Sequence, residues 1–241
     1  HTGVLLMQSK IMKKITNTRN GYHFNSKYWQ DWKKSLPMID SKLFQLILGM
    51  VLSDATMYRV SHEALVKFEQ GADQKEFLFH LFQECKEYCF MTEPGIRKYI
   101  HGPKQGEVKS YWFKTFSHTS FSIIWDLFYN ISSNGGVTKK TINPGIILNH
   151  LNEVGLAYWV MGDGSLHREG RVLTLHTQGY SQDENKMISE ELNLKFGFKS
   201  KVVKHKNKFV VQFTTSDANK LHDLIKPHLI STMQYKLPRK L

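Results

Sequence analysis

The sequence predicts an α+β fold built from two similar αββαββα repeats, each with its own antiparallel sheet. Three observations predict this class. An apolar helix that ends on an aspartate occurs twice, the same order of helices and strands follows both copies, and a short linker containing Pro144 and Gly145 separates them. Because chance would hardly repeat a whole series of elements, we interpret the pattern as an internal duplication.

The composition indicates a polyanionic partner. The chain of 241 residues carries 33 Lys and Arg against 21 Asp and Glu, a formal net charge of +12. Such an excess of positive charge usually binds nucleic acid and sometimes a membrane surface. No apolar run reaches the roughly 18–20 residues that a membrane-spanning helix needs, so no membrane partner is expected.

The two cysteines, Cys85 and Cys89, lie one helical turn apart. This spacing suits neither a zinc site, which would need two further ligands, nor a disulfide framework. We therefore expect two small core residues on a helix, and this cysteine usage fits a reducing compartment.

The two halves keep nearly the same spacing. The aspartates that end the apolar helices, Asp54 and Asp163, are 163 − 54 = 109 residues apart, and the Gln-Gly pairs that follow, at Gln70 and Gln178, are 178 − 70 = 108 apart. The elements expected in the first repeat are a helix within 43–57, a strand at 64–71, a helix at 74–90, strands at about 95–101 and 109–116, and a helix at 120–129. Those expected in the second are a helix within 154–166, a strand at 172–179, a helix at 182–196, strands at 198–204 and 208–215, and a helix at 218–225.

The repeats divide the chain into segments. We expect an N-terminal extension over residues 1–40, a first repeat over 41–142, a linker over 143–153 and a second repeat over 154–241. In the extension, aromatic residues are interleaved with Lys and Arg, which predicts an ordered surface segment and not a cleaved presequence. These aromatic residues are Tyr22, Phe24, Tyr28, Trp29 and Trp32.

Helical geometry predicts that the two aspartates meet. Positions four apart share a helix face, so Gly49 and Ser53 line one stripe, and Tyr158 and Gly162 line the equivalent one. Three of these four residues are small, which lets two helix backbones approach closely. Two helices packed in this way would place both aspartates at the same end.

Two carboxylates held close together repel each other, and burial increases the cost. A divalent cation relieves this repulsion, and Mg²⁺ accepts one or two carboxylates while keeping waters and phosphate oxygens in its shell. Metal-bridged carboxylates beside a phosphodiester describe a metal-assisted phosphoryl hydrolase. One such aspartate alone would as readily be a polar helix-end residue, but two in register in a basic chain favour the metal site.

At these helices the chain resembles the LAGLIDADG homing endonucleases of the monomeric, two-repeat type. The nine-residue motif of that family matches Ile47–Ala55 and Leu156–Gly164, and its eighth position is the metal-binding acid, here Asp54 and Asp163. Its third position is usually glycine, and Tyr158 departs from this, so looser packing is expected there. The resemblance covers all but the N-terminal extension. It implies a monomer in which two antiparallel sheets form a saddle on a central two-helix interface.

The resemblance also implies residues beside the metal. A basic residue late in each repeat matches Lys140 and Lys236, which would stabilise charge on the scissile phosphate, perturb a water, or only contact a phosphate. A glutamine one strand after each motif helix matches Gln70 and Gln178, which would lie near metal-bound waters or only form hydrogen bonds at a strand end. Further metal ligands are expected among the backbone carbonyls of Ser53, Ala55 and Gly162.

In the implied saddle, the sheet face without helices is free for DNA. If Val66 and Phe68 face the core, their strand neighbours face the DNA. Paired strands fit the major groove, and their polar side chains reach base edges or phosphates. A register error of one residue would turn these side chains to the other face. The residues expected on the DNA face are Lys67, Glu69, Arg97, Tyr99, Trp112 and Lys114 in the first repeat, and Thr174, His176, Lys204, Lys208 and Gln212 in the second.

The implied activity is hydrolysis of one phosphodiester in each strand of a long, asymmetric double-stranded DNA target, leaving short 3′ overhangs and promoting intron mobility. Mg²⁺ would be the cofactor, Mn²⁺ would substitute for it, and Ca²⁺ would bind without supporting cleavage. A metal-bound water would attack in line, and no side chain is an evident general base. We also expect a mitochondrial or other organellar location.

Other functions remain open. An intron RNA maturase would bind intron RNA with the same scaffold, and a DNA-binding protein would have kept the fold and lost cleavage. The two acids favour cleavage, because a pure binder has no need of two repelling carboxylates. A general basic RNA-binding domain would instead show exposed aromatic stacking platforms and no duplicated acid motif.

Overall fold

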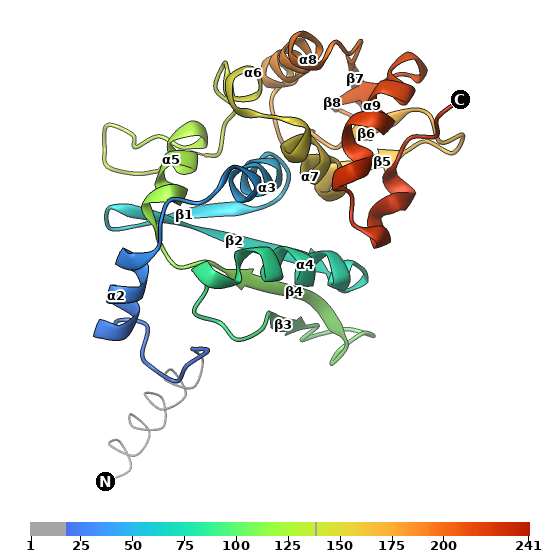
Figure 1. The fold of residues 1–241 in the computed structure, drawn as a ribbon. Helices are drawn as coiled ribbons and strands as arrows, with labels where there is room; N and C mark the ends of the chain where they lie inside the picture. The colour runs from blue at the N-terminus through green and yellow to red at the C-terminus, as the bar shows by residue number, and fades with distance from the viewer. Residues whose placement is uncertain (1–17, 138) are drawn as a thin grey trace. The chain divides into compact units, whose positions relative to one another are not determined.

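The computed structural model describes residues 18–137 and 139–241, so the expectations for residues 1–17 lie outside the described part. The chain forms two compact units (Figure 1). Unit 1 comprises the described residues up to Ile39 together with Thr56–Ser122, and unit 2 comprises Asp40–Ala55 together with Ile123–Leu241. These units cut across the expected repeats, because the first motif helix belongs to unit 2.

The elements follow the predicted αββαββα order in both repeats, which confirms the α+β class. The first repeat contains α3 (Ser41–Leu52), β1 (Thr56–Val60), β2 (Glu63–Gly71), α4 (Lys75–Cys85), β3 (Gly95–Lys98), β4 (Val108–Lys114) and α5 (Thr119–Phe128). The second contains α7 (Glu153–Asp163), β5 (Gly164–Leu166), β6 (Leu173–Leu175), α8 (Gln182–Phe196), β7 (Lys201–His205), β8 (Lys208–Phe213) and α9 (Ala218–Ile225). The other elements are α2 (Lys27–Ser35), α6 (Ile146–His150), and the 3₁₀ turns η1 (Ala72–Gln74), η2 (Lys86–Tyr88), η3 (Thr215–Asp217), η4 (Lys226–His228) and η5 (Ser231–Lys236). Within the described ranges, no helix is long and apolar enough to cross a bilayer.

Each unit holds one four-stranded antiparallel sheet, as expected. The strand order is β1-β2-β4-β3 in unit 1 and β5-β6-β8-β7 in unit 2. Helix α4 covers one face of the first sheet (Figure 1), and α8 packs on β7 and β8 of the second. Val66 and Phe68 of β2 are buried, so they face the helix side, as the alternation predicts.

Helix bounds follow from local capping. Helix α8 has the predicted bounds because Ser181 and Glu184 form a capping box at its start, and Gly197 adopts the left-handed conformation at its end. The helix expected over 74–90 is shorter, since α4 ends at Cys85 and the 3₁₀ turn η2 follows.

Cys85 and Cys89 are free and buried, as expected, and the Cys89 thiol donates to the Cys85 carbonyl at 3.3 Å.

Helices α3 and α7 lie side by side in unit 2 (Figure 1). The two helices approach each other closely at glycines, which have no side chain. A Cβ on Gly49 would collide with the Gly155 carbonyl, and one on Gly162 would collide with the Ser53 hydroxyl. Tyr158 is only 2% exposed, and its Cβ lies 3.0 Å from the Cβ position of Gly49. The expected looser packing at Tyr158 is therefore wrong, because Gly49 on the facing helix makes room for the tyrosine.

Candidate metal and nucleic-acid site

The two motif aspartates occupy slightly different positions at their helix ends. Asp163 is the last residue of α7, whereas α3 ends at Leu52, so Asp54 follows that helix by two residues. Asp163 is half-buried and Asp54 is exposed. The Ser53 hydroxyl lies 3.3 Å from Asp54 Oδ1 and also hydrogen-bonds to the Asp163 carboxylate. Its single proton can therefore satisfy only one carboxylate at a time.

The carboxylates are close enough to affect each other's ionisation. Burial and, second, the negative charge of Asp54 raise the pKa of Asp163 to about 7, while Ser53, Lys140 and Lys236 act in the opposite direction. A carboxyl group with this pKa is partly protonated at neutral pH. The prediction that both aspartates gather at one end of the paired helices is therefore confirmed.

A lysine lies at the C-terminal end of each motif helix. The Lys140 ammonium donates to the carbonyls of Val51, at 2.9 Å, and Ala55, at 3.2 Å, and the Lys236 ammonium donates to the Met161 carbonyl at 2.6 Å. The negative end of a helix dipole favours a cation at this place. Burial lowers the pKa of both lysines, and the two aspartates oppose that effect. Both lysines thus lie beside the carboxylates, and their catalytic role stays a prediction.

The backbone carbonyls expected as metal ligands already have a partner in two cases. Ser53 O and Ala55 O accept from Lys140 at 3.5 and 3.2 Å. A carbonyl oxygen has two lone pairs, so these bonds leave room for a second partner. The ligand roles of Ser53, Ala55 and Gly162 stay predictions. Among the residues that the structure describes, no cluster of three or more His, Cys, Asp or Glu side chains could hold a metal ion.

Tyr180 is part of this site, and the sequence reasoning missed it. Its hydroxyl donates to the Leu52 carbonyl at 2.7 Å, at the C-terminal end of α3. Burial, followed by the charge of Asp163, raises the pKa of this phenol well above its usual range. Tyr180 stands just after the second Gln-Gly pair, and no motif marks it.

The strand register changes how the two halves correspond. Lys67 of β2 lies opposite Thr56, and Thr174 of β6 lies opposite Ser165. Thr56 and Ser165 each follow their motif aspartate by two residues. Equivalent positions on β2 and β6 are therefore 174 − 67 = 107 residues apart, one fewer than the spacing of the Gln-Gly pairs.

Gln70 and Gln178 are thus offset by one residue from the register in which β1 pairs with β2 and β5 with β6. In the sheet register Glu69 corresponds to His176, and Gln70 corresponds to Thr177. Gln70 is 8% exposed and alternates with Glu69, so its side chain belongs to the helix-covered face of its sheet. Gln178 lies beside the His176 ring. A role of either glutamine near metal-bound waters stays a prediction.

The helix-free face of the unit 1 sheet carries a connected polar cluster. Glu69 accepts hydrogen bonds from Ser110, at 2.6 Å, and Arg97, at 3.2 Å, and lies 3.6 Å from the Lys67 ammonium. Arg97 and Lys67 both lie over the Trp112 ring, at 5.2 and 5.7 Å from its centroid. Burial alone would raise the pKa of Glu69, but the bonds from Ser110 and Arg97 and the nearby cations lower it.

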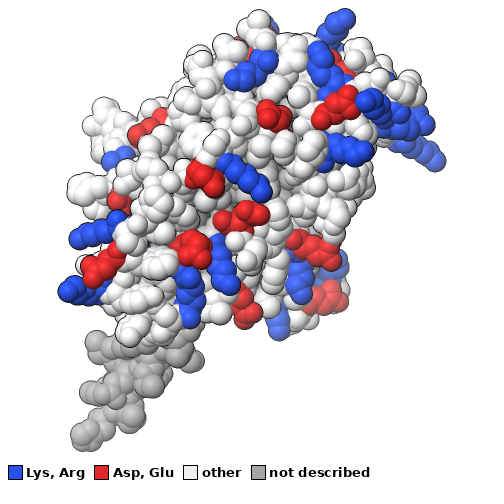
Figure 2. Space-filling model, viewed as in Figure 1, with Lys and Arg blue, Asp and Glu red and all other residues white. Residues whose placement is uncertain are grey.

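The register confirms the expected face for five of the six unit 1 residues, namely Lys67, Glu69, Arg97, Trp112 and Lys114. Lys67 pairs with Lys114, Glu69 with Trp112, and Arg97 with Ser110, which places them together on the helix-free side. The register does not confirm the face of Tyr99, because a shift between Arg97 and Lys98 precedes it; its ring lies 5.9 Å from the ammonium groups of Lys104 and Lys109. On the other side of unit 1, over α4, Figure 2 shows acidic and basic side chains interspersed. Whether these residues contact DNA stays a prediction.

In unit 2, the Thr174 and Gln212 pair marks the helix-free face. Thr174 is 6% exposed, because His167 and Gln212 bond to its hydroxyl at 3.1 and 3.4 Å. It therefore supports these two side chains and is itself shielded. His176 lies on the same face and bonds to the Ser165 hydroxyl at 2.7 Å.

The expected face of Lys204 is wrong. Lys204 pairs with Phe209 and alternates with His205, which pairs with Lys208 on the Gln212 face. Lys204 therefore belongs to the opposite face, while Lys201 and His205 take the place that the sequence reasoning assigned to it. A register error of one residue on β7 explains the mistake, since β7 carries no regular alternation of apolar and polar residues.

Comparison with known proteins agrees with this geometry. The model of the LAGLIDADG DNA endonuclease family matches residues 44–221. The chain belongs to this family. The LAGLIDADG protein is 90% identical over 136 residues, 56% of its length, to the "Probable intron-encoded DNA endonuclease 3" of Mycosarcoma maydis, of which 98% is covered. It is also similar to the solved structure titled "The homing endonuclease I-WcaI bound to its DNA recognition sequence", with 26% identity, a TM-score of 0.79, and coverage of 90% of this chain and 95% of that one.

A relative named for a different role is also similar to this chain. The LAGLIDADG protein is 25% identical to the "Cytochrome b mRNA maturase bI2" of Saccharomyces cerevisiae, over 96% of this chain and 55% of the maturase. The chain thus spans about half the length of that relative. The chain is therefore similar both to proteins named as endonucleases and to a protein named as a maturase.

Proposed function

We propose that this LAGLIDADG protein is a site-specific endonuclease that hydrolyses one phosphodiester in each strand of a long, asymmetric double-stranded DNA target, leaves short 3′ overhangs, and thereby promotes intron mobility. The observation that carries the proposal is the electrostatic coupling of Asp54 and Asp163 at the ends of two packed helices. Two repelling carboxylates destabilise a protein that only binds DNA, whereas a hydrolase uses them.

The donor set fits a divalent metal. Asp54 and Asp163 offer carboxylate oxygens, and the charge repulsion that raises the pKa of Asp163 is what a bound cation would relieve. Carbonyls of Ser53, Ala55 and Gly162 would add oxygen ligands. Mg²⁺ would be the natural ion, Mn²⁺ would replace it, and Ca²⁺ would bind without supporting cleavage. When bound, the ion would activate water and neutralise charge on the phosphate.

The lysines would supply positive charge at the scissile phosphates. Lys140 and Lys236 are held by helix-end carbonyls, so their ammonium groups are already positioned beside the carboxylates. A fixed donor costs little reorganisation when negative charge develops on a phosphate oxygen. Each lysine has further protons to donate, because an ammonium carries three.

The sheet faces would read the DNA. In unit 1 the guanidinium of Arg97 and the ammonium of Lys67 are held over Trp112 by Glu69. Such preorganised donors suit base edges and phosphates. The two sheets carry different side chains at equivalent positions, so one monomer would recognise an asymmetric target.

Cleavage of the intron-lacking form of the protein's own gene tests this proposal. A duplex across the intron insertion junction, incubated with the protein and Mg²⁺, should be cut in both strands. Asp54→Asn and Asp163→Asn should bind this duplex without cutting it, whereas Asp126→Asn, an exposed residue of α5, should cut normally. Tight binding without cleavage by the unsubstituted protein, or a normal cutting rate in either motif variant, would overturn the proposal.

An intron RNA maturase is the second candidate function. It is supported by the similarity to a cytochrome b mRNA maturase, which also supports the proposed mitochondrial or other organellar location. The two functions are separable, since splicing assistance would survive Asp54→Asn and DNA cleavage would not. A cleavage-inactive DNA-binding protein is disfavoured, because both acids are present.

A further inference from the structure

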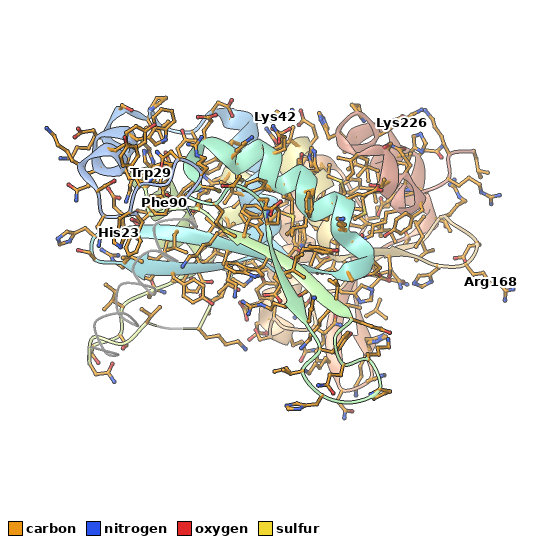
Figure 3. The ribbon with its side chains drawn as sticks, turned by 90° about the horizontal axis from the view of Figure 1, so that it is seen from below. His23, Trp29, Lys42, Phe90, Arg168 and Lys226 are labelled. Atoms are coloured by element: carbon orange, nitrogen blue, oxygen red, sulfur yellow. The ribbon has the colours of Figure 1, made fainter. Side chains whose placement is uncertain are left out.

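The N-terminal segment before the first repeat is firmly attached to unit 1. Arg19 N donates to the Phe90 carbonyl at 2.7 Å, and its guanidinium lies over the rings of Trp29 and Trp32, 5.2 and 5.3 Å from their centroids. Trp29 is 1% exposed and meets Phe90 edge to face at 5.0 Å. Figure 3 shows His23, Trp29 and Phe90 gathered at one end of unit 1. The described part of this segment is therefore an ordered wall, as its composition predicted.

This wall encloses a pocket with the helix-free face of the sheet. The pocket measures about 950 Å³, at the upper end of the roughly 300–1,000 Å³ typical of small-ligand sites. On one side it is lined by the N-terminal segment and on the other by the first sheet. Its apolar lining includes Phe24, Leu65, Phe90, Pro94, Trp112 and Phe116.

Flat aromatic surfaces dominate this pocket. A Cβ on Gly95 would collide with the indole of Trp112, so the absence of a side chain there lets the ring lie directly on the backbone. Phe24 is 41% exposed, and its ring lies 6.1 Å from that of Phe90. Phe90 in turn meets Phe116 at 5.1 Å. The pocket therefore offers ring faces and edges to a planar ligand.

Positive charge accompanies the aromatic lining. Lys33 and Lys114 line the pocket, against one acidic residue, Glu93. The Lys33 ammonium is positioned by a 2.8 Å bond to Ser117 Oγ and lies 5.6 Å from the Phe116 ring. Its contact with Glu63, at 4.0 Å, is partly exposed and weak. A ligand that combines a planar apolar ring with negative charge fits this lining.

We propose that this pocket binds an unpaired nucleobase of a single-stranded nucleic acid, with the base against the exposed ring of Phe24, in the space that Trp112 helps to line, and a neighbouring phosphate near Lys33 and Lys114. Bases in a duplex are stacked on each other and cannot present their faces to an apolar pocket unless they are flipped out. Unpaired bases stack on aromatic side chains, and lysines follow the backbone. This site goes beyond the proposed DNA cleavage and does not depend on it.

Binding of fluorescent 12-mers of uridine and of thymidine tests the proposal. Phe24→Ala should weaken binding about tenfold, since stacking contributes on the order of 1–3 kcal/mol per base. Lys33→Gln should weaken it less and reduce its salt dependence. The matched controls are Tyr22→Ala, an exposed aromatic residue of the same segment, and Lys27→Gln, on the same helix as Lys33; neither residue lines the pocket. Both controls should bind as the unsubstituted protein does.

The two oligonucleotides distinguish the source of the base. Tighter binding of the uridine 12-mer assigns the pocket to RNA, and equal binding assigns it to any single strand. A 5-iodouridine 12-mer, cross-linked by ultraviolet light, should attach to peptides that contain Phe24 or Trp112. Melting temperatures close to that of the unsubstituted protein check that the variants are folded.

Three results would overturn the proposal. The unsubstituted protein could fail to bind either 12-mer, the control variants could weaken binding as much as Phe24→Ala does, or the cross-links could map only to residues outside the pocket. A 12-base-pair duplex whose binding depends equally on Phe24 would also overturn it, because the pocket would then belong to a duplex-binding surface.

Discussion

The phenolic hydroxyl of Tyr180 donates a 2.7 Å hydrogen bond to the carbonyl oxygen of Leu52, the last residue of α3. Tyr180 belongs to the second repeat and α3 to the first, so one half of the duplication completes the helix end of the other. The last carbonyls of a helix have no partner within it. Here Lys140 donates a hydrogen bond to the Val51 carbonyl, and Tyr180 donates one to the Leu52 carbonyl. The bonds that hold this end of α3 also hold the backbone that carries Asp54.

Replacing Tyr180→Phe should destabilise the protein by about 1–3 kcal/mol, because it leaves the Leu52 carbonyl without its protein donor. Urea unfolding measures this change in the free energy of unfolding. Tyr22→Phe, at a residue that is 55% exposed, is the control and should have almost no effect. Equal stability of the two variants would show that the bond contributes nothing.

Replacing Gly49→Ala should destabilise the protein by about 1–3 kcal/mol, although alanine favours a helix by about 1 kcal/mol over glycine. The new methyl group would collide with the Gly155 carbonyl, and a backbone atom cannot move aside cheaply. Gly179→Ala is the control, since nothing lies within 4 Å of a Cβ there. Thermal unfolding compares the two, and a Gly49→Ala protein as stable as its control would contradict the close approach of α3 and α7.

The titration of Asp163 should make the metal-free protein less stable as the pH rises. The pKa of Asp163 is raised from 3.8 to about 7, so the folded chain keeps a proton that the unfolded chain loses between these values. The stability contributed by this group is therefore present in acid and lost as the pH rises through about 7. Between pH 4 and pH 8 the unfolding free energy should fall by about 2–4 kcal/mol relative to Asp163→Asn. Parallel pH curves in the presence of a chelator would contradict the shift.

Mg²⁺ should stabilise the protein more at pH 8 than at pH 6, because at the lower pH the ion must first displace the proton of Asp163. Calorimetric titration in two buffers of different ionisation enthalpy should detect release of a proton at pH 6. Asp163→Asn should abolish that release, while Asp126→Asn should not. Binding without proton release at pH 6 would show that the ion does not bind to Asp163.

Much of the fold could be predicted from the sequence because it depends on local patterns. The bounds of α8 were predicted from its apolar periodicity, and in the structure a Ser-x-x-Glu capping box and a glycine fix the same two ends. The short strand β6 was predicted too long, as 172–179, because only Leu173, Thr174 and Leu175 pair with the neighbouring strands. Periodicity marks the apolar residues, whereas pairing depends on the neighbouring strand.

The residues of the candidate site divide in the same way, into those that sequence motifs predicted and those that depend on contacts between distant parts of the chain. Asp54, Asp163, Lys140 and Lys236 were found because each belongs to a motif that occurs twice. The roles of Gln70 and Gln178 stay predictions, and the Gln-Gly pairs are spaced one residue differently from the paired positions of β2 and β6. Tyr180 was missed, since its role depends on one hydrogen bond to a carbonyl that is 128 residues away in the chain.

The sequence by itself determined the duplication, the order of helices and strands, the two acids and the basic charge, because apolar periodicity and repeated motifs are local properties of the chain. Only the tertiary structure decided which side chains share a sheet face, how Gly49 accommodates Tyr158, and how the N-terminal aromatic residues form one wall of a pocket. These features depend on strand register and on contacts between distant residues. A shift of one residue reverses a sheet face while leaving the composition and the order of elements unchanged.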